Sequence, residues 1–326
     1  MSIKRRHALA LAASLVVGTL YSNPAFAEWP EGPVTMVVPW GAGGGTDATA
    51  RMIANLLQKE LGVPVPVVNR TGGSGVVGHA AIADAAPDGS TIGIATLEIG
   101  TMHHLGLTEL DYKAYTPVGL YNSDPAAVFV RADSEYADMK ALLEALSKAA
   151  DRELKASGSA QGGVNHLAIA GMLAAAGLPV ERVAWVPSEG AAPGLQDLAA
   201  GGVAIATASM PEAEALMQAG RIKPLAIFST ARLEKYPDVP TFEEASGHAF
   251  AMGSWRGVVA PAGLVPEVVT KLTDAMAKVV NDPAYLSFMQ ERGYATQWTP
   301  RQEFETFMAT SDATLGETLK SVGLAK

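Results

Sequence analysis

Residues 34–61 read VTMVVPWGAGGGTDATARMIANLLQKEL. The stretch opens on a short run rich in β-branched residues, which is typical of a buried strand. A loop with four glycines follows. The second half predicts a helix with one buried face, because apolar residues recur there at spacings of three and four: Ala50, Ile53, Ala54, Leu57 and Leu61. This order of strand, loop and helix predicts an α/β layer.

The same alternation continues along the chain. Strands are predicted at 34–38, 65–68, 91–95, 118–120, 127–130, 183–186, 203–207, 225–228 and 257–259. Helices are predicted at 48–61, 78–85, 139–150, 165–176, 191–200, 211–219, 266–281, 283–292 and 301–319. Such alternation predicts an α/β fold with mainly parallel sheets flanked by helices.

The length of the chain favours two lobes, and no Pro/Ser-rich linker separates them. The chain is therefore expected to cross between the lobes on strands, with hinges near 121–126 and 228–254. We expect residues 28–124 to form the first part of lobe 1, 125–228 to form lobe 2, and 229–326 to return through the hinge and complete lobe 1.

The N-terminus has the pattern of a secretory signal peptide. Lys4, Arg5 and Arg6 precede an apolar run at 8–20, and Ala25-Phe26-Ala27 supplies the small residues of a cleavage site. The apolar run is shorter than the ~20 residues needed to span a bilayer. Residues 1–27 are therefore expected to be removed before Glu28, which places the mature chain in the periplasm.

The composition excludes several classes of function. Loss of residues 1–27 removes three cations and takes the formal net charge from −9 to −12, and such a charge disfavours nucleic acid and anionic lipid as partners. The chain has no cysteine, so it has neither a disulfide nor a thiolate nucleophile nor a cysteine-ligated metal. No cofactor is expected.

The loop at 39–47 is suited to holding an anion. Its glycines bring backbone N–H groups close to a ligand, and the helix behind it contributes about half a positive charge at its N-terminus. It is not a P-loop, because no Gly-Lys-Ser/Thr follows. A structural turn is the alternative, with Asp47 as the N-cap of the helix.

A second glycine-rich loop, at 69–78, matches the dinucleotide pattern G-x-G-x-x-G at Gly73, Gly75 and Gly78, and Glu98 lies about 20 residues further on. This pattern is the best indication of an enzyme. However, it follows the second predicted strand of the domain rather than the first, and the chain is expected to be exported. The simpler interpretation is another helix N-terminus that faces the same cleft.

A third cluster, at 156–166, joins a predicted strand to a helix and contains Ser157, Ser159 and His166. Its hydroxyl groups and backbone amides could donate to a carboxylate from the other lobe. Catalytic patterns are absent: the sequence contains neither G-x-S-x-G nor H-E-x-x-H. His103 and His104 are adjacent and are expected to point to different sides, so no metal site is predicted.

The segment from Val37 to Arg51 resembles the opening of the substrate-binding proteins of tripartite tricarboxylate transporters, the Bug family. The resemblance continues collinearly through Val68-Asn69-Arg70, Ala86-Pro87-Asp88-Gly89, Gly190-Ala191-Ala192-Pro193, Asp238-Val239-Pro240-Thr241 and Ala260-Pro261-Ala262-Gly263. It covers essentially all of the mature chain. Trp40 and Ala42 depart from the family pattern, since many relatives have Pro-Phe and a second proline there, and many have a lysine or another residue at Glu189. Trp255-Arg256 stands where relatives often have Trp-Phe.

The resemblance implies a type II periplasmic-binding-protein fold, in which two α/β lobes close over a small organic acid, commonly a di- or tricarboxylate. It implies that the first loop holds a ligand carboxylate and that the 157–166 loop does so from the second lobe. Arg256 could bind a distal carboxylate or pair with a surface acid, and Trp40 could cover an apolar part of the ligand or pack beside its loop. The predicted ligand-binding residues are Trp40, Gly44, Gly45, Thr46, Asp47, Gly73, Ser74, Thr96, Ser157, Ser159, His166, Glu189, Gly190, Ala191, Ser209 and Arg256.

The function implied by the resemblance is capture of a small carboxylate and its delivery to the membrane permease of a tripartite tricarboxylate transporter, by a monomer that catalyses no reaction. A ligand-sensing adaptor for a membrane sensor kinase is the main alternative. A secreted hydrolase and a dinucleotide enzyme are weaker alternatives, because the chain shows neither an activated nucleophile nor a dinucleotide pattern on a first strand.

Overall fold

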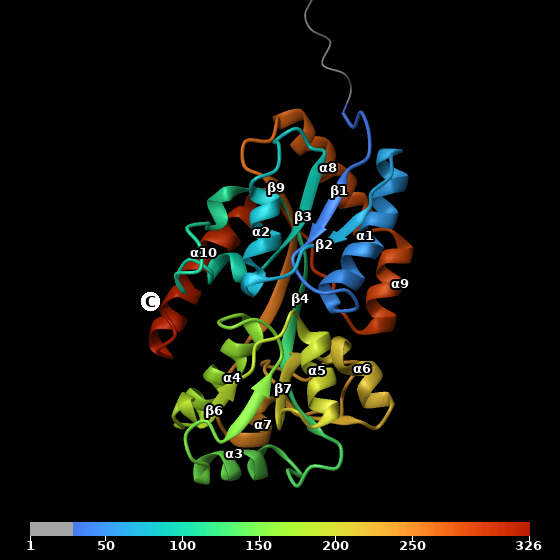
Figure 1. The fold of residues 1–326 in the computed structure, drawn as a ribbon. Coiled ribbons are helices and arrows are strands. Elements are labelled where there is room, and N and C mark those ends of the chain that lie inside the picture. Colours follow the sequence, from blue (N-terminus) through green and yellow to red (C-terminus); the bar gives the residue numbers. More distant parts are fainter. Residues whose placement is uncertain (1–28) are drawn as a thin grey trace, which may run out of the picture.

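The computed structural model describes residues 29–326, which form two lobes stacked one above the other (Figure 1). The predicted signal peptide, 1–27, lies outside the described residues. Each lobe has a sheet with helices on both of its faces, so the predicted two-lobed α/β architecture is confirmed. No helix within 29–326 combines the length and apolar character needed to cross a membrane.

Lobe 1 is built on a mixed sheet with the strand order β2-β1-β3-β9-β4, so the prediction of a mainly parallel sheet is wrong here, because the returning strand β9 enters antiparallel to its neighbours. Strands β1 and β2 are parallel, as are β1 and β3, whereas β9 is antiparallel to both β3 and β4. The strands are β1 (Thr35–Val38), β2 (Val67–Asn69), β3 (Thr91–Thr96), β9 (Gly253–Pro261), the first part of β4 (Tyr115–Arg131), and β10 (Thr299–Pro300), which pairs with β4.

Helices cover both faces of this sheet. Helix α1 (Gly45–Leu61) packs with α8 (Pro266–Val279) and α9 (Pro283–Arg292) on one face, and α2 (Val76–Ala83) and α10 (Arg301–Ser321) lie on the other (Figure 1). The predicted stripe on α1 is confirmed, since Ala50, Ile53, Ala54 and Leu57 are buried in the core between α1 and α8. Short 3-10 turns connect some elements: η1 (Gly73–Gly75), η2 (Leu97–Gly100) and η3 (Tyr112–Ala114).

Lobe 2 repeats this plan with the strand order β4-β7-β5-β6, and β8 also pairs with β4. Strands β5 (Leu154–Ser157), β6 (Val183–Trp185) and β7 (Ile205–Ser209) are parallel, while β4 is antiparallel to both β7 and β8 (Ile222–Ile227). The helices are α3 (Met139–Lys148), α4 (Val164–Ala175), α5 (Ala191–Ala200), α6 (Met210–Gln218) and α7 (Phe242–Ser246), with the turn η4 (Val180–Arg182).

One long strand joins the two lobes. The sequence predicts two strands, at 118–120 and 127–130, with a hinge between them, but the structure has the single strand β4 across all 17 residues. The reason is pairing with β9, which continues through the expected hinge: Asn122 lies opposite Arg256, and Pro125 lies opposite Gly253. The lobes are thus connected by two paired strands, and the lobe boundaries at 124/125 and 228/229 remain predictions.

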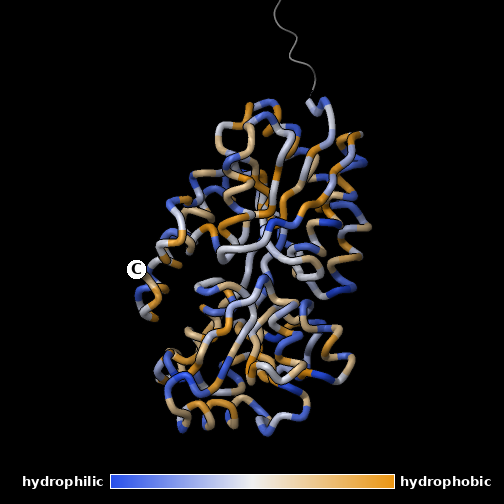
Figure 2. The backbone as a smooth tube through the Cα atoms, viewed as in Figure 1, coloured by the Kyte–Doolittle hydropathy of each residue, from blue (hydrophilic) through white to orange (hydrophobic). Residues whose placement is uncertain are grey.

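Hydropathy follows this architecture. Figure 2 shows hydrophobic segments, in orange, in the sheets and on the inner faces of the helices of both lobes. The backbone between the lobes is mostly white, as expected for loops rich in glycine, serine and threonine. The junction is therefore a region of intermediate hydropathy between two apolar cores.

Candidate ligand-binding site between the two lobes

A narrow pocket, with a cavity volume of about 40 Å³ and partly open to solvent, lies where the lobes meet. Both lobes and β9 contribute to its wall. The lining residues are Trp40, Gly41, Gly44, Gly45, Thr46, Thr96 and Glu98 from lobe 1; Ser159, Val164, Asn165, Gly190, Ala191, Ala192, Pro193 and Glu212 from lobe 2; and Ser254, Trp255 and Arg256 from β9.

The N-terminus of α1 faces this pocket and holds a carboxylate from the opposite lobe. The Gly45 N–H donates to Glu212 Oε1 at 3.1 Å, across the cleft. Glu212 stands in the first turn of α6, where its other oxygen accepts from the backbone N–H and the hydroxyl of Ser209 at 3.1 and 2.8 Å. The partial positive charge at the start of α1 favours an anion in this position.

At the N-terminus of α4 the two lobes exchange roles: the helix belongs to lobe 2 and the carboxyl group to lobe 1. The Val164 N–H donates to Glu98 Oε1 at 3.2 Å, so a carboxyl group from lobe 1 lies at the start of a helix in lobe 2. The absence of a side chain at Gly163 makes this approach possible, since a Cβ there would lie 2.8 Å from Glu98 Oε1. The closed cleft is thus bridged by two carboxyl groups, each at a helix N-terminus of the opposite lobe.

Thr96 lies between Glu98 and His79, which compete for its single hydroxyl proton. Thr96 Oγ1 accepts from Trp40 Nε1 at 3.2 Å, and it contacts both Glu98 Oε2, at 2.5 Å, and His79 Nε2, at 3.3 Å. His79 Nδ1 must donate to the carbonyl of Gly75, at 2.9 Å. The single hydroxyl proton of Thr96 cannot serve both remaining partners, so either Glu98 or His79 carries an additional proton.

Burial decides between the two. It raises the pKa of the Glu98 carboxyl above its ordinary value, and it lowers the pKa of His79 to about 4. Both shifts favour the neutral forms, so we expect Glu98 rather than His79 to carry the additional proton.

This assignment predicts a pH-dependent effect of Glu98→Gln, since glutamine has the shape and hydrogen-bonding capacity of the protonated acid. A carboxyl whose pKa is raised in the folded state contributes stability below its ordinary pKa, 4.5, and loses that contribution as the pH rises through the raised value. The melting temperature of the variant should therefore increase relative to wild type as the pH is raised from about 4 to about 8.

Glu153→Gln is the matched control, because Glu153 is exposed and also accepts one backbone N–H, from Ala150 at 2.6 Å. Its melting temperature relative to wild type should change little over the same range. A difference between Glu98→Gln and wild type that stays constant with pH would contradict the assignment of the proton.

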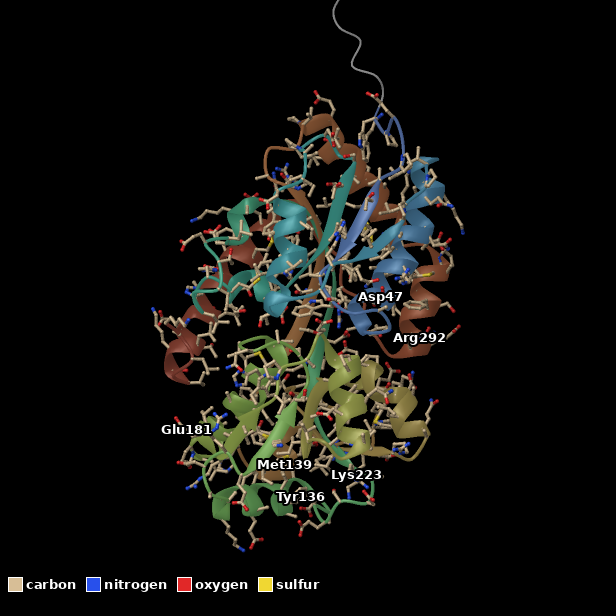
Figure 3. The ribbon with its side chains drawn as sticks, viewed as in Figure 1. Asp47, Tyr136, Met139, Glu181, Lys223 and Arg292 are labelled. Carbon is tan, nitrogen blue, oxygen red and sulfur yellow. The ribbon has the colours of Figure 1, made fainter. Side chains whose placement is uncertain are left out.

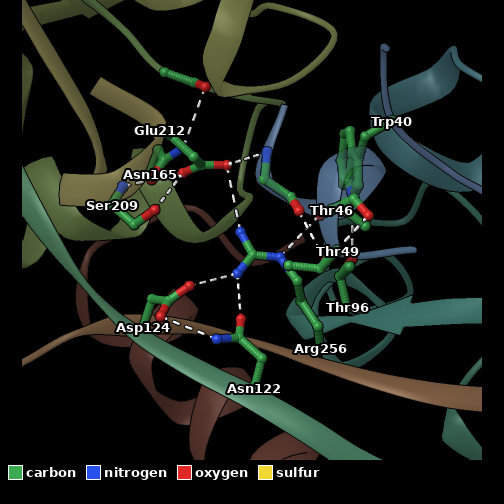
Figure 4. A network of polar contacts seen from close by, with 12 residues as sticks. Trp40, Thr46, Thr49, Thr96, Asn122, Asp124, Asn165, Ser209, Glu212 and Arg256 are labelled. Atoms are coloured by element: carbon green, nitrogen blue, oxygen red, sulfur yellow. Dashed lines mark hydrogen bonds and ion pairs between the residues drawn. The ribbon is translucent and has the colours of Figure 1, made fainter. Parts of the chain in front are cut away.

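Arg256 forms the centre of a buried network (Figure 4). Its Nη1 donates to Asp124 at 2.7 Å and also to the side-chain oxygen of Asn122, and Nη2 donates to Glu212 at 3.3 Å. Nε donates to the Thr46 hydroxyl at 3.1 Å. Burial alone would lower the pKa of Arg256, but the carboxylates of Glu212 and Asp124 raise it above its ordinary value.

This network adds a third alternative to the two predicted for Arg256. The guanidinium pairs with the buried Asp124 and the partly buried Glu212 instead of a surface acid, and three of its nitrogens are engaged within the protein. Arg256 still lines the pocket, so contact with a ligand remains a prediction. Its observed contacts fix the positions of Thr46 and Glu212, which belong to opposite walls of the pocket.

Nine of the sixteen predicted residues line the interlobe pocket: Trp40, Gly44, Gly45, Thr46, Thr96, Ser159, Gly190, Ala191 and Arg256. Gly73, Ser74 and Glu189 line a neighbouring pocket, which shares Trp40 with the first. Asp47, Ser157, His166 and Ser209 line neither of these two pockets.

The last four residues have other partners within the protein. Ser157 Oγ donates to the carbonyl of Val186 at 2.8 Å, and Ser209 belongs to the capping box of α6. His166 accepts from the Gly162 N–H at 2.9 Å and stacks on Trp185, and burial lowers its pKa to about 4.

The prediction that Asp47 is the N-cap of α1 is wrong, because the N-cap is Gly44 and the helix begins at Gly45. Asp47 lies in the first turn on the side of lobe 1 that faces lobe 2 (Figure 3). Its carboxylate accepts from Gly43 N at 3.0 Å, from Asn69 and from Arg51. These contacts hold the pKa of Asp47 below its ordinary value although burial raises it. Asp47 therefore stabilises the conformation of the glycine-rich loop at 39–47.

The dinucleotide-like pattern has a packing role. A Cβ on Gly78 would lie 2.4 Å from Pro39 Cα, and one on Gly75 would lie 2.9 Å from the ring of Trp40. Gly73 and Gly75 also have positive φ angles, of 57° and 91°. Glu98, the acid expected to contact a ribose in that alternative, instead caps α4. The second loop therefore supports the first by close packing.

Several pocket residues were not predicted from the sequence, and they include Glu212, Asn165, Ser254 and Trp255. A local signal was present for Glu212, because Ser209-x-x-Glu212 is a capping-box sequence that locates a helix start. No local signal indicates that its carboxylate reaches the opposite lobe.

The fold and the interlobe pocket define a two-lobed solute-binding protein. The family model described as "Tripartite tricarboxylate transporter family receptor" matches residues 49–324, so the chain belongs to that family, as the resemblance predicts.

Three solved structures resemble the chain over most of its length. The periplasmic binding protein BugD has a TM-score of 0.85 and 28% identity, and the match covers 91% of this chain and all of BugD (100%). The R. palustris protein Rpa4515 with adipate has a TM-score of 0.84 and 30% identity, with 91% and 99% covered. MatC from Rhodopseudomonas palustris with bound malate has a TM-score of 0.80 and 25% identity, with 89% and 100% covered. The family and these neighbours are solute-binding proteins and not enzymes.

Proposed function

We propose that this chain binds a small organic carboxylate, of the di- or tricarboxylate class, in the interlobe pocket. The observation that carries the proposal is the pair of helix N-termini that face each other across the cleft, at Gly45 and Val164. Each already donates a backbone N–H to a carboxyl oxygen, of Glu212 and Glu98 respectively. The same amides and dipoles favour a carboxylate brought by a ligand. Adipate and malate in Rpa4515 and MatC support this ligand class.

Ser159 offers a further donor for such a ligand. Its hydroxyl is buried, lines the pocket and has no hydrogen-bond partner among residues 29–326. An unpartnered buried hydroxyl is costly, and a ligand oxygen in the pocket would satisfy it. The binding energy would then come from hydrogen-bond donors of both lobes, which stabilise the closed state relative to the open one.

The charged residues of the pocket determine how it can bind an anionic ligand. Arg256 is already balanced by Asp124 and Glu212, so it supplies no free positive charge. A neutral Glu98 avoids repulsion between its carboxyl group and a bound anion. The proposed mechanism is therefore recognition by oriented dipoles and hydroxyl groups, with Glu98 protonated in the closed state.

The proposal includes the cellular role. Residues 1–27 would direct export, the mature protein would capture its ligand in the periplasm, and the closed form would dock on the membrane permease of a tripartite tricarboxylate transporter. Membership of the receptor family supports this role. Uptake of the identified acid by cells with and without the gene for this chain would test delivery separately from binding.

The binding test is a thermal-shift screen of residues 28–326 against mono-, di- and tricarboxylates, including adipate and malate, with amino acids and sugars as neutral controls. A ligand at 100 times its dissociation constant adds about 2.7 kcal/mol of stability, so a specific acid should raise the melting temperature. Ser159→Ala should reduce that shift. Ser147→Ala, at an exposed serine of α3, should leave it unchanged. A shift produced by neutral solutes alone would reject the carboxylate proposal.

A further inference from the structure

Three metal-ligating side chains meet on lobe 1, outside the interlobe pocket. His103 and His104 lie in the turn that follows η2, and Asp312 projects from the middle of α10. One ligand atom from each of the three residues lies within 4.8 Å of the other two. All three side chains are partly buried, and none lines the interlobe pocket.

Adjacent residues were expected to point apart, which is why no metal site was predicted here. That geometry holds for regular strands and helices, but residues 101–106 form consecutive turns. The two imidazole rings consequently lie on the same side, with their centroids 4.0 Å apart. Both rings face α10, so the expectation that they point to different sides is wrong.

The polar atoms of this cluster are poorly satisfied by one another. His103 Nε2 lies 3.1 Å from Asp312 Oδ1, and His104 Nε2 lies 3.9 Å from Asp312 Oδ2. Yet His103 Nδ1, His104 Nε2 and Asp312 Oδ1 are buried atoms without a hydrogen-bond partner among residues 29–326. The lone pairs of His104 Nε2 and Asp312 Oδ1 are therefore available to a metal ion.

The backbone is shaped to bring the two segments together. A Cβ on Gly316 would lie 2.7 Å from the ring of His104, and one on Gly100 would lie 3.2 Å from Asp312 Cα. Glycines at both positions therefore allow the turn to contact α10 directly. The Lys326 N–H also donates to the His104 carbonyl, at 3.0 Å, which fixes the turn from its other side.

We propose that His103, His104 and Asp312 form a binding site for a divalent transition-metal ion, with Zn²⁺ as the representative ion. Two imidazoles and one carboxylate are a donor set suited to Zn²⁺, Ni²⁺, Co²⁺ or Cu²⁺ rather than to Ca²⁺ or Mg²⁺, which prefer oxygen ligands. Ligands about 2.1 Å from a tetrahedral ion lie roughly 3.4 Å apart. His103 and His104 lie 3.1 and 3.9 Å from different oxygens of Asp312, and one ligand atom from each of the three residues lies within 4.8 Å of the others, so a small movement would bring them to that spacing.

Metal bound here would link the turn after η2 to α10. The same turn continues from η2, which carries the pocket residue Glu98. The ion would therefore stabilise the segment that positions Glu98, and water could complete its coordination from the solvent side.

The test uses residues 28–326 without a histidine tag, dialysed against a chelator and then titrated with Zn²⁺ by calorimetry and with Co²⁺ by visible absorption. We expect one ion per chain, Co²⁺ bands that report nitrogen and oxygen ligation, and a higher melting temperature with Zn²⁺. His104→Gln and Asp312→Asn should each weaken Zn²⁺ binding by at least about 10-fold, because even the loss of an outer-shell partner costs 10- to 100-fold.

His248→Gln is the matched control, since His248 is an exposed histidine far along the chain in lobe 2. It should leave the affinity and the Co²⁺ spectrum unchanged. Circular dichroism in chelator should show that the two site variants are folded. The proposal is overturned if wild type takes up no stoichiometric ion, or if binding survives both site variants.

Discussion

Replacement of Arg256 by methionine should lower the free energy of unfolding by about 3–5 kcal/mol. Arg256 lies between Asp124 and Glu212 and is buried, so its removal leaves two carboxylates without their cation in a site of low polarity. Breaking a buried ion pair from one side costs this much because the remaining charge is uncompensated. Urea denaturation followed by circular dichroism measures the change.

Arg232→Met is the matched control for this experiment. Arg232 also pairs with the glutamate of a capping box, Glu244, at 2.8 Å, but the pair is exposed. Exposed pairs contribute roughly 0–1 kcal/mol. If the two variants lost the same stability, the buried network would have no special role in holding β9 against the two lobes.

Glu212→Gln should favour the open state and lower the free energy of unfolding by about 1.5–3 kcal/mol, the range for hydrogen bonds to charged groups. Glutamine can still complete the capping box with Ser209, but it carries no charge to interact with Arg256 or with the N-terminus of α1. Small-angle X-ray scattering should show a larger radius of gyration, and urea denaturation should show the loss of stability.

Glu244→Gln isolates the local effect, since it makes the same change in the capping box of α7, where Glu244 contacts only its own lobe. Its radius of gyration should equal that of wild type. An unchanged radius for Glu212→Gln as well would mean that the carboxylate across the cleft does not hold the lobes together.

The elements that the sequence predicts well are those determined by local patterns. The strand, loop and helix at 34–61 were predicted because glycine freedom, apolar spacing and helix dipoles all act over a few residues. The same holds for Gly44, Gly45 and Thr46, which lie at the pocket as expected. Their backbone groups face the cleft because the loop lies at the end of a central strand.

The elements that were missed depend on distant contacts. Gly45 and Glu212 are separated by 167 positions, and Glu98 and Val164 by 66, so no local pattern indicates either contact. The direction in which a side chain points also depends on distant contacts. His166 stacks on Trp185 because of packing inside lobe 2. The continuity of β4 depends on β9, which is more than 120 residues away in the sequence.

The position of β9 has a consequence for biosynthesis. The strand lies between β3 and β4 in the sheet of lobe 1, so that sheet lacks one of its interior strands until the ribosome has passed Pro261. The β-strands of lobe 2, in contrast, are complete once β8 has been made. Domains whose parts are distant in sequence fold late, because loop closure must precede their contacts. Late completion of the first lobe is compatible with the proposed export, because a chain that has not finished folding can still be translocated in an unfolded state.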